Sequence, residues 1–181
     1  MLRRRLWILW LAAAFSAVAA LGYQLSLDPY RPQTVGQEMR CPVCGMYPSL
    51  SPEWMTQIVF RDRGMIAFDS PLEMLRYLHD LPRYGKGRRA ADIERIYVSD
   101  YAHGGWLRAE AAFFVAGARI RGPMRDENYP AFSARGDAEV FIRREGGEIR
   151  SYAQIAATPP PAHPQPSPSS VPEGPARRQP L

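Results

Sequence analysis

This 181-residue sequence contains only two cysteines and three histidines. The histidines, at positions 79, 103 and 163, show no paired spacing typical of metal ligands. Zinc sites usually require three or four nitrogen, sulfur or oxygen ligands, so a zinc protein is the weaker interpretation. The sequence also lacks a Ser-His-Asp pattern, a catalytic carboxylate pair and a glycine-rich phosphate-binding loop. Nothing therefore argues for a hydrolase or a nucleotide-dependent enzyme.

The middle of the chain also lacks a basic excess, although the formal net charge is +5. Arginines at positions 3–5 supply three of these charges, and the C-terminal tail supplies one more. Residues 6–157 together carry only +1. Nucleic-acid-binding domains usually have a basic stripe on the folded part, so nucleic acid is excluded as a partner.

No cysteine precedes Cys41, so the N-terminus offers no site for a lipid anchor. Instead, residues 6–27 form an uncharged, mostly apolar run that is long enough for one membrane-spanning helix. The preceding arginines predict a cytoplasmic N-terminus, with the rest of the chain facing the periplasm from the inner membrane. A cleaved signal peptide is the alternative, because residues 17–19 (Ala-Val-Ala) resemble a cleavage site.

Composition divides the remaining chain into three parts. Residues 28–39 are expected to form a tether, and residues 40–157 the folded domain. Residues 158–181 contain nine prolines and very few apolar side chains, which predicts a disordered tail.

Within the domain we expect an α+β fold of two similar ββα-type modules, at about residues 40–90 and 91–157. In the first, strands at 55–60 and 65–68 form a hairpin. A helix then begins after Ser70, with Pro71 at the first helical position and Glu73 completing a Ser-x-x-Glu capping box. Pro82 is expected to end this helix. In the second, strands at 93–98 and 112–115 precede a helix near Asp137 that stops at residues 146–147. Phe68 and Phe132 occupy equivalent places, each just before a helix.

The leading functional motif is Cys41-Pro-Val-Cys44-Gly-Met46. Thiolate and thioether sulfurs are soft ligands that select Cu(I), and Gly45 allows the tight turn that would bring Met46 toward Cys44. Zinc binding, a thiol-disulfide redox site and a plain structural disulfide remain alternatives. The redox alternative is weakened because no amphipathic helix starts at the first cysteine.

A second motif, Gly122-Pro-Met124-Arg-Asp126-Glu127, places a methionine at a turn, where a ligand is easier to explain than core packing. Asp126 contributes an oxygen donor, which is a poor ligand for Cu(I). His103 lies on a glycine-rich loop and is a further candidate nitrogen donor.

As an ordered set, these motifs resemble those of the NosL family of nitrous oxide reductase accessory proteins. The similar segments are residues 41–47, 68–70, 96–101, 122–124 and 137–141, so the resemblance extends from about residue 40 to residue 155. It implies two similar α+β modules and a non-enzymatic periplasmic metallochaperone that binds one Cu(I). The implied ligands are Cys44 and Met124, with Cys41 and Met46 as auxiliaries.

Two departures from the family pattern bear on function. Asp126 occupies a position that is commonly histidine, which should weaken Cu(I) binding or shift the third ligand elsewhere. An apolar helix would also replace the usual lipid anchor. The resemblance predicts apo nitrous oxide reductase of denitrification as the acceptor, or another copper enzyme such as a terminal oxidase. A thiol-disulfide or copper-reducing protein is the alternative function.

Overall fold

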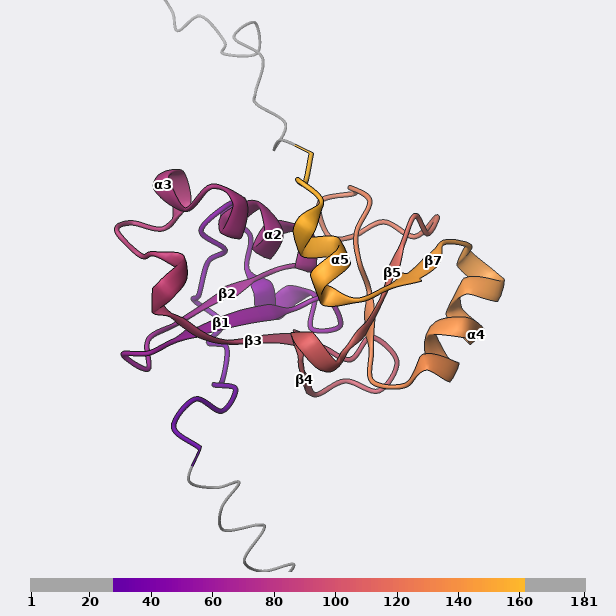
Figure 1. The fold of residues 1–181 in the computed structure, drawn as a ribbon, viewed down its shortest axis with the longest axis horizontal. Helices are drawn as coiled ribbons and strands as arrows, with labels where there is room; N and C mark the ends of the chain where they lie inside the picture. The colour runs from indigo at the N-terminus through magenta and orange to yellow at the C-terminus, as the bar shows by residue number, and fades with distance from the viewer. Residues whose placement is uncertain (1–27, 162–181) are drawn as a thin grey trace, which may run out of the picture.

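The computed structural model describes residues 28–161, which form an α+β domain with two antiparallel sheets (Figure 1). The predicted membrane segment and most of the proline-rich tail lie outside these residues. Among the residues described, no helix is long and apolar enough to cross a membrane. The predicted α+β class is confirmed.

The first sheet has the strand order β2-β1-β3-β4. It consists of β1 (Thr56–Phe60), β2 (Met65–Phe68), β3 (Ile93–Ser99) and β4 (Trp106–Arg108). The predicted β1–β2 hairpin is confirmed, with Ile58 opposite Ile66. All five residues of β1 are buried, because β1 is paired along both edges and packed within the domain core.

Helix α2 (Pro71–His79) begins where the sequence predicted. The Ser70 hydroxyl accepts a hydrogen bond from the Glu73 N–H at 3.4 Å, and Pro71 occupies the first turn. The prediction that Pro82 ends this helix is wrong, because α2 already ends at His79. Pro82 lies in the first turn of a second helix, α3 (Leu81–Tyr84), where its missing N–H costs nothing.

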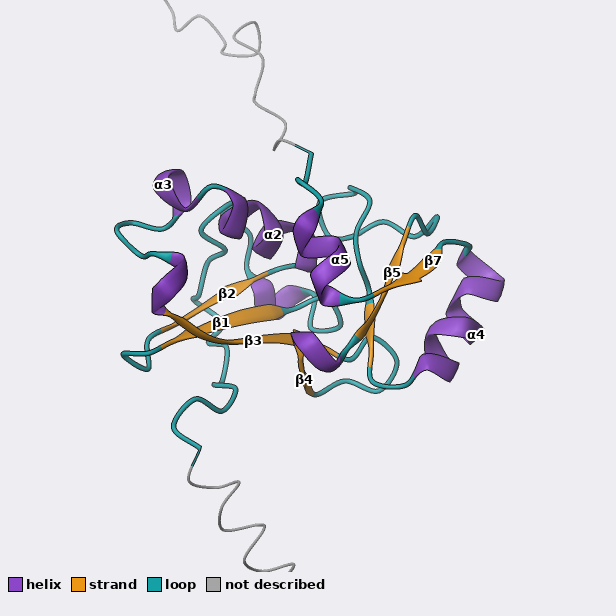
Figure 2. Ribbon diagram, viewed as in Figure 1, coloured by secondary structure: helices purple, strands orange, loops and turns teal. Residues whose placement is uncertain are grey.

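The second sheet has the strand order β6-β5-β7, and helix α4 packs against it. Its elements are β5 (Phe113–Ala116), β6 (Ala131–Phe132), α4 (Arg135–Glu145) and β7 (Glu148–Arg150). Figure 2 shows α4 at the opposite end of the molecule from α3. Three short 3-10 helices, at Pro48–Leu50, Ala90–Asp92 and Ala109–Ala111, complete the connections.

The two halves share a ββαβ plan rather than the predicted ββα plan. In each half the first strand is central, the second lies on one side, and the strand after the helix lies on the other. The equivalence of Phe68 and Phe132 is confirmed, since they end β2 and β6. The prediction that residues 93–98 are the first strand of the second module is wrong. These residues pair with β1, a partner that hydrophobic pattern alone does not reveal.

The last helix, α5 (Tyr152–Ala157), returns to the first half of the molecule, where Figure 1 shows it between α2 and the second sheet. Ile155 is 2% exposed and belongs to the same core cluster as Ile58 and Phe68. His79 on α2 is 2.8 Å from the Ala156 carbonyl. A parallel bridge between Asp100 and Ala131 also links the halves, so they form one packed unit.

Helix α2 is tied to the 122–128 loop by two polar contacts. The Leu72 N–H donates to Oδ1 of the buried Asn128 at 3.1 Å. The Arg76 guanidinium is 5% exposed and donates to Asp126 at 3.1 Å, to Glu73 at 2.5 Å and to the Pro161 carbonyl at 2.9 Å. One buried cation therefore joins α2, the loop that carries Met124 and the end of the described chain.

We expect Arg76→Met to lower the free energy of unfolding by about 3–5 kcal/mol. The substitution removes the buried cation that pairs with the carboxylates of Glu73 and Asp126. Urea denaturation of the full chain measures this. The matched control is Arg135→Met, which removes an exposed pair with Glu139 on α4. Exposed helix pairs contribute roughly 0.3–0.5 kcal/mol, so equal losses in the two variants would contradict the role given to Arg76.

Candidate metal centre

The cysteine motif folds as a closed loop before the first sheet. The Cys41 N–H donates to the Met46 carbonyl at 2.8 Å, and the Gly45 N–H donates to the Cys41 carbonyl at 2.9 Å. Gly45 has a φ of 76°, a left-handed conformation that glycine adopts at little cost. The turn expected from the glycine is therefore present, and it sets both cysteines on one short, hydrogen-bonded loop.

Asp69 faces this loop from the first sheet and completes a three-residue cluster. The sulfurs of Cys41 and Cys44 and a carboxylate oxygen of Asp69 all lie within 4.8 Å of one another. The Cys44 thiol donates to Asp69 Oδ1 at 3.1 Å. Asp69 lies between the end of β2 and the capping residue of α2, so two elements of regular structure fix its position.

The cluster is largely shielded from solvent. Cys41 is 2% exposed and Asp69 is 1% exposed, while Cys44 is half-buried. Asp69 Oδ2 is buried and has no hydrogen-bond partner among the described residues. A buried carboxylate oxygen without a partner carries a desolvation cost that a metal cation would offset.

The Cys44 thiol is held in its protonated form when no metal is bound. Its hydrogen bond with Cys41, and then burial, raise the pKa of Cys44 well above the ordinary value. Metal binding requires deprotonated thiolate, so loading this site would release protons.

The donor set consists of two thiols and one carboxylate. Both cysteines are free, so the structural-disulfide alternative does not describe this structure. Two close thiolates suit a soft ion such as Cu(I). The carboxylate is a hard donor that binds Cu(I) weakly, and its main contribution is negative charge. The residues therefore fit a soft, monovalent metal better than a hard one.

The structure places the two candidate methionines on the loops that the sequence indicated. Met46 follows the cysteine loop, and its side chain is 39% exposed. Met124 lies in a turn that is closed by the Arg125 N–H donating to the Gly122 carbonyl at 2.8 Å. A Cβ at Gly122 would lie 2.3 Å from Asn128, so this turn requires glycine. Both methionines remain predicted ligands.

Asp126 lies in the same turn as Met124, but its carboxylate accepts from Arg76. It is not part of the described three-residue cluster. The ion pair makes Asp126 an anchor of the turn in the metal-free protein.

The histidines lie elsewhere in the part of the chain that is described. His103 Nε2 is 3.0 Å from the Asp137 carboxylate on α4, and His79 contacts the backbone of α5. Neither joins the thiol cluster, and His163 lies outside the described residues.

Asp69 is the candidate ligand that the sequence analysis did not predict. The signal was present, because Asp69 directly precedes a strongly capped helix whose start was correctly predicted. A carboxylate at such a junction is fixed in position and does not extend freely into solvent.

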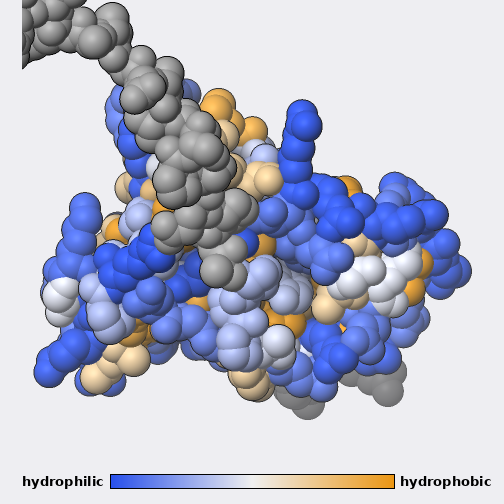
Figure 3. Space-filling model, turned by 90° about the horizontal axis from the view of Figure 1, so that it is seen from above, coloured by the Kyte–Doolittle hydropathy of each residue, from blue (hydrophilic) through white to orange (hydrophobic). Residues whose placement is uncertain are grey.

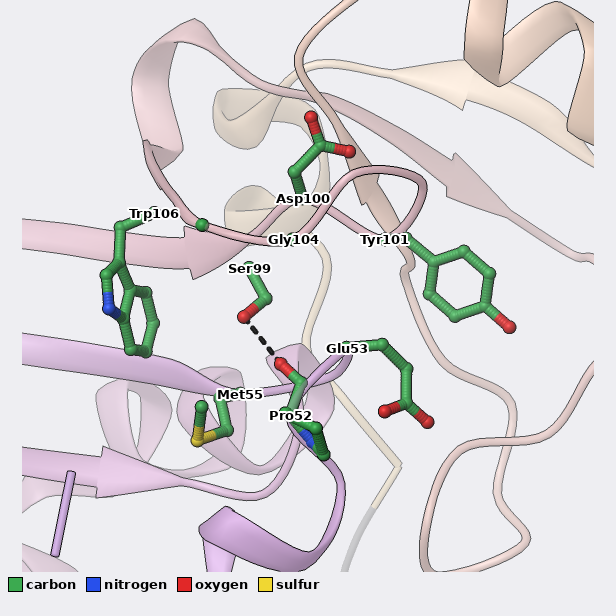
Figure 4. Close-up of a pocket in the computed structure, with 9 residues that line it drawn as sticks. Pro52, Glu53, Met55, Ser99, Asp100, Tyr101, Gly104 and Trp106 are labelled. Atoms are coloured by element: carbon green, nitrogen blue, oxygen red, sulfur yellow. Dashed lines mark hydrogen bonds between the residues drawn. The ribbon is translucent and has the colours of Figure 1, made fainter.

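Away from the thiol cluster, a hollow of about 270 Å³ lies where the β3–β4 loop meets residues 52–55 (Figure 4). Ser99 spans its base by donating to the Pro52 carbonyl at 2.6 Å. Burial alone would raise the pKa of Asp100, but hydrogen bonds from Ser133, Ala102 and His103 lower it below the ordinary value. Asp100 therefore stabilises its own loop. Among the described residues, no group of three His, Cys, Asp or Glu ligands lies at this hollow.

Comparison with known proteins identifies the family of the chain. A sequence model of the NosL family matches residues 32–159. The copper-binding lipoprotein NosL of Achromobacter cycloclastes is 33% identical over 89 residues, which cover 43% of this chain and 46% of that protein. The alignment thus spans less than half the length of that relative.

Solved structures are also similar. The crystal structure of the copper chaperone NosL from Shewanella denitrificans has a TM-score of 0.57 and 25% identity, covering 71% of this chain and 97% of that one. The solution structure of apo-NosL from Achromobacter cycloclastes has a TM-score of 0.38 and 28% identity, covering 55% and 83%.

We expect Asp69→Asn to weaken metal binding without lowering the stability of the metal-free protein. The substitution removes an anionic donor, but it also removes a buried charge that has an unpartnered oxygen. Urea denaturation and titration with Cd(II), followed by thiolate absorption, measure the two effects. The control is Asp137→Asn on α4, which should leave metal binding unchanged. A large loss of metal-free stability in Asp69→Asn would show that Asp69 is chiefly structural.

Proposed function

Because the chain belongs to the NosL family, we propose that it binds one Cu(I) ion at the Cys41–Cys44–Asp69 cluster and carries it to a copper enzyme. The observation that supports this proposal is the approach of two thiols and a buried carboxylate to within 4.8 Å. The relatives are described as copper-binding and as a copper chaperone, which agrees with the soft donors found here.

Cys41 and Cys44 are the proposed first ligands. Met46 and Met124 are proposed to supply thioether sulfur from the two flanking loops. The partial exposure of Met46 would let it follow the metal outward as an acceptor approaches. Asp126 is proposed to act through its ion pair with Arg76, holding the Met124 turn in place.

We propose a carrier rather than an enzyme, in agreement with the description of one relative as a copper chaperone. Cys41 is 2% exposed, so little of its sulfur is open to attack on a disulfide of another protein. A low coordination number favours transfer of the metal, because a ligand of the acceptor can bind before the original ligands leave.

We propose apo nitrous oxide reductase as the acceptor, with another copper enzyme, such as a terminal oxidase, as the second candidate. The chain is proposed to act from the periplasmic face of the inner membrane, held by residues 6–27. The basic residues 3–5 and the apolar run after them support this placement.

Titration of the reduced full chain with Cu(I) against a competing chelator tests the proposal. We expect one-to-one binding that Cys44→Ser weakens by more than about a hundredfold, since it removes a thiolate ligand. Met124→Leu, which keeps the apolar volume, should weaken binding by about tenfold if its thioether is a ligand.

The matched control is Met74→Leu, which alters a methionine that is buried on α2. Absence of competitive binding by the reduced parent would sink the carrier proposal. A loss in Met74→Leu equal to that in Met124→Leu would assign the effect to packing.

A further inference from the structure

A hollow of about 430 Å³ lies between the cysteine loop and the turn after α3. Cys41 and Gly45 belong to its wall, so it shares that wall with the candidate metal centre. Phe60 and Tyr84 contribute aromatic surface. The hollow is open to solvent beside the thiol loop.

The charged side chains that line this hollow are all cations. Arg40, Lys86 and Arg88 contribute positive charge, and no carboxylate lines it. Residues 28–161 together carry only +1, so this is a local concentration. Arg88 pairs with Asp62 at 2.7 Å, but Lys86 is exposed and makes no ion pair or hydrogen bond with the described residues.

Tyr77 adds a hydrogen-bond donor to the same hollow. It is 1% exposed and lines the hollow, yet its hydroxyl has no hydrogen-bond partner among residues 28–161. Burial raises the pKa of Tyr77, while the nearby Arg88 lowers it, so the hydroxyl lies within the field of that cation. Because Tyr77 lines the hollow, an incoming carboxylate would be able to accept a hydrogen bond from this hydroxyl.

Backbone hydrogen bonds hold the cations in place. The Gly85 N–H donates to the Leu81 carbonyl at 2.8 Å, and the Arg88 N–H donates to the Gly85 carbonyl at 2.9 Å. Arg40 is fixed from the other side by the Gly45 carbonyl at 3.1 Å and by the Tyr47 ring at 4.2 Å. The backbone that carries these cations is therefore fixed, and binding a ligand would mainly require ordering of the exposed Lys86 side chain.

We propose that this hollow docks an acidic segment of the protein that exchanges copper with the adjacent thiol loop. This inference rests on the proposed function. The lining cations would pair with carboxylates of that segment, and the Tyr77 hydroxyl would donate to one of them. Such pairing orients the partner and accelerates encounter, and it weakens as salt screens the charges.

The chain's own ends do not match this site in charge. Residues 1–27 carry +3 and residues 162–181 carry +1, so neither complements a cationic hollow. The face shown in Figure 3 is mainly hydrophilic, with apolar residues in small separate patches.

The test uses the reduced, metal-free full chain and a labelled peptide of four Glu-Gly repeats, with a Gln-Gly twin as control. We expect the acidic peptide to bind at least about tenfold more tightly than its twin at low salt. The difference should shrink several-fold at about 200 mM salt. Fluorescence anisotropy gives both affinities.

Lys86→Gln and Tyr77→Phe should each weaken peptide binding several-fold, while Arg144→Gln on α4 should not. Cu(I) affinity should be unchanged in Lys86→Gln, so a failure of metal binding is distinguishable from a failure of docking. Equal binding of the two peptides, or equal loss in Arg144→Gln, would overturn the proposal.

Two further outcomes would assign the hollow to a different occupant and overturn the proposal. The first is binding of free glutarate as tightly as the peptide. The second is a salt-sensitive dimer of this chain that Lys86→Gln abolishes.

Discussion

The arrangement of the domain depends on the hydrogen bonds of the Arg76 guanidinium. It bonds within α2 to Glu73, across to Asp126 and outward to the carbonyl of Pro161. The start of the same helix positions Asp69 against the thiols. One helix therefore sets the distance between the cysteine loop and the methionine turn, although about 80 residues separate them in sequence.

Much of the fold could be predicted from local signals. The β1–β2 hairpin and the cap of α2 were predictable because turn residues, alternation and capping act over a few positions. The partner of β3 was not predictable, since pairing is decided between segments far apart in sequence. The short elements β7 and α5 were missed because they are too brief to show a period. The prediction that Pro82 ends α2 failed because proline is tolerated in the first turn of a new helix as well as after the end of the preceding one.

The candidate site was predictable in the same uneven way. The cysteine loop followed from spacing, because Cys41, Cys44 and Gly45 act within six residues. Asp69 did not, since its role depends on burial beside a loop 25 positions away. Asp126 resembled a ligand in sequence, but the structure gives it a cation, Arg76, that no local pattern predicts. Tertiary contacts decide which carboxylate meets the thiols.

The return of α5 to the first half has a consequence for how the chain reaches its folded state. Ile155 and Tyr152 contribute to the core cluster that also contains Ile58 and Phe68, so that core lacks part of its packing until almost the whole domain is present. Contacts of such long sequence separation slow folding, because the intervening chain must be ordered first. A nascent chain would thus stay open until its last helix emerges. Its two thiols would remain accessible during that interval to whatever redox agents or metals the chain meets.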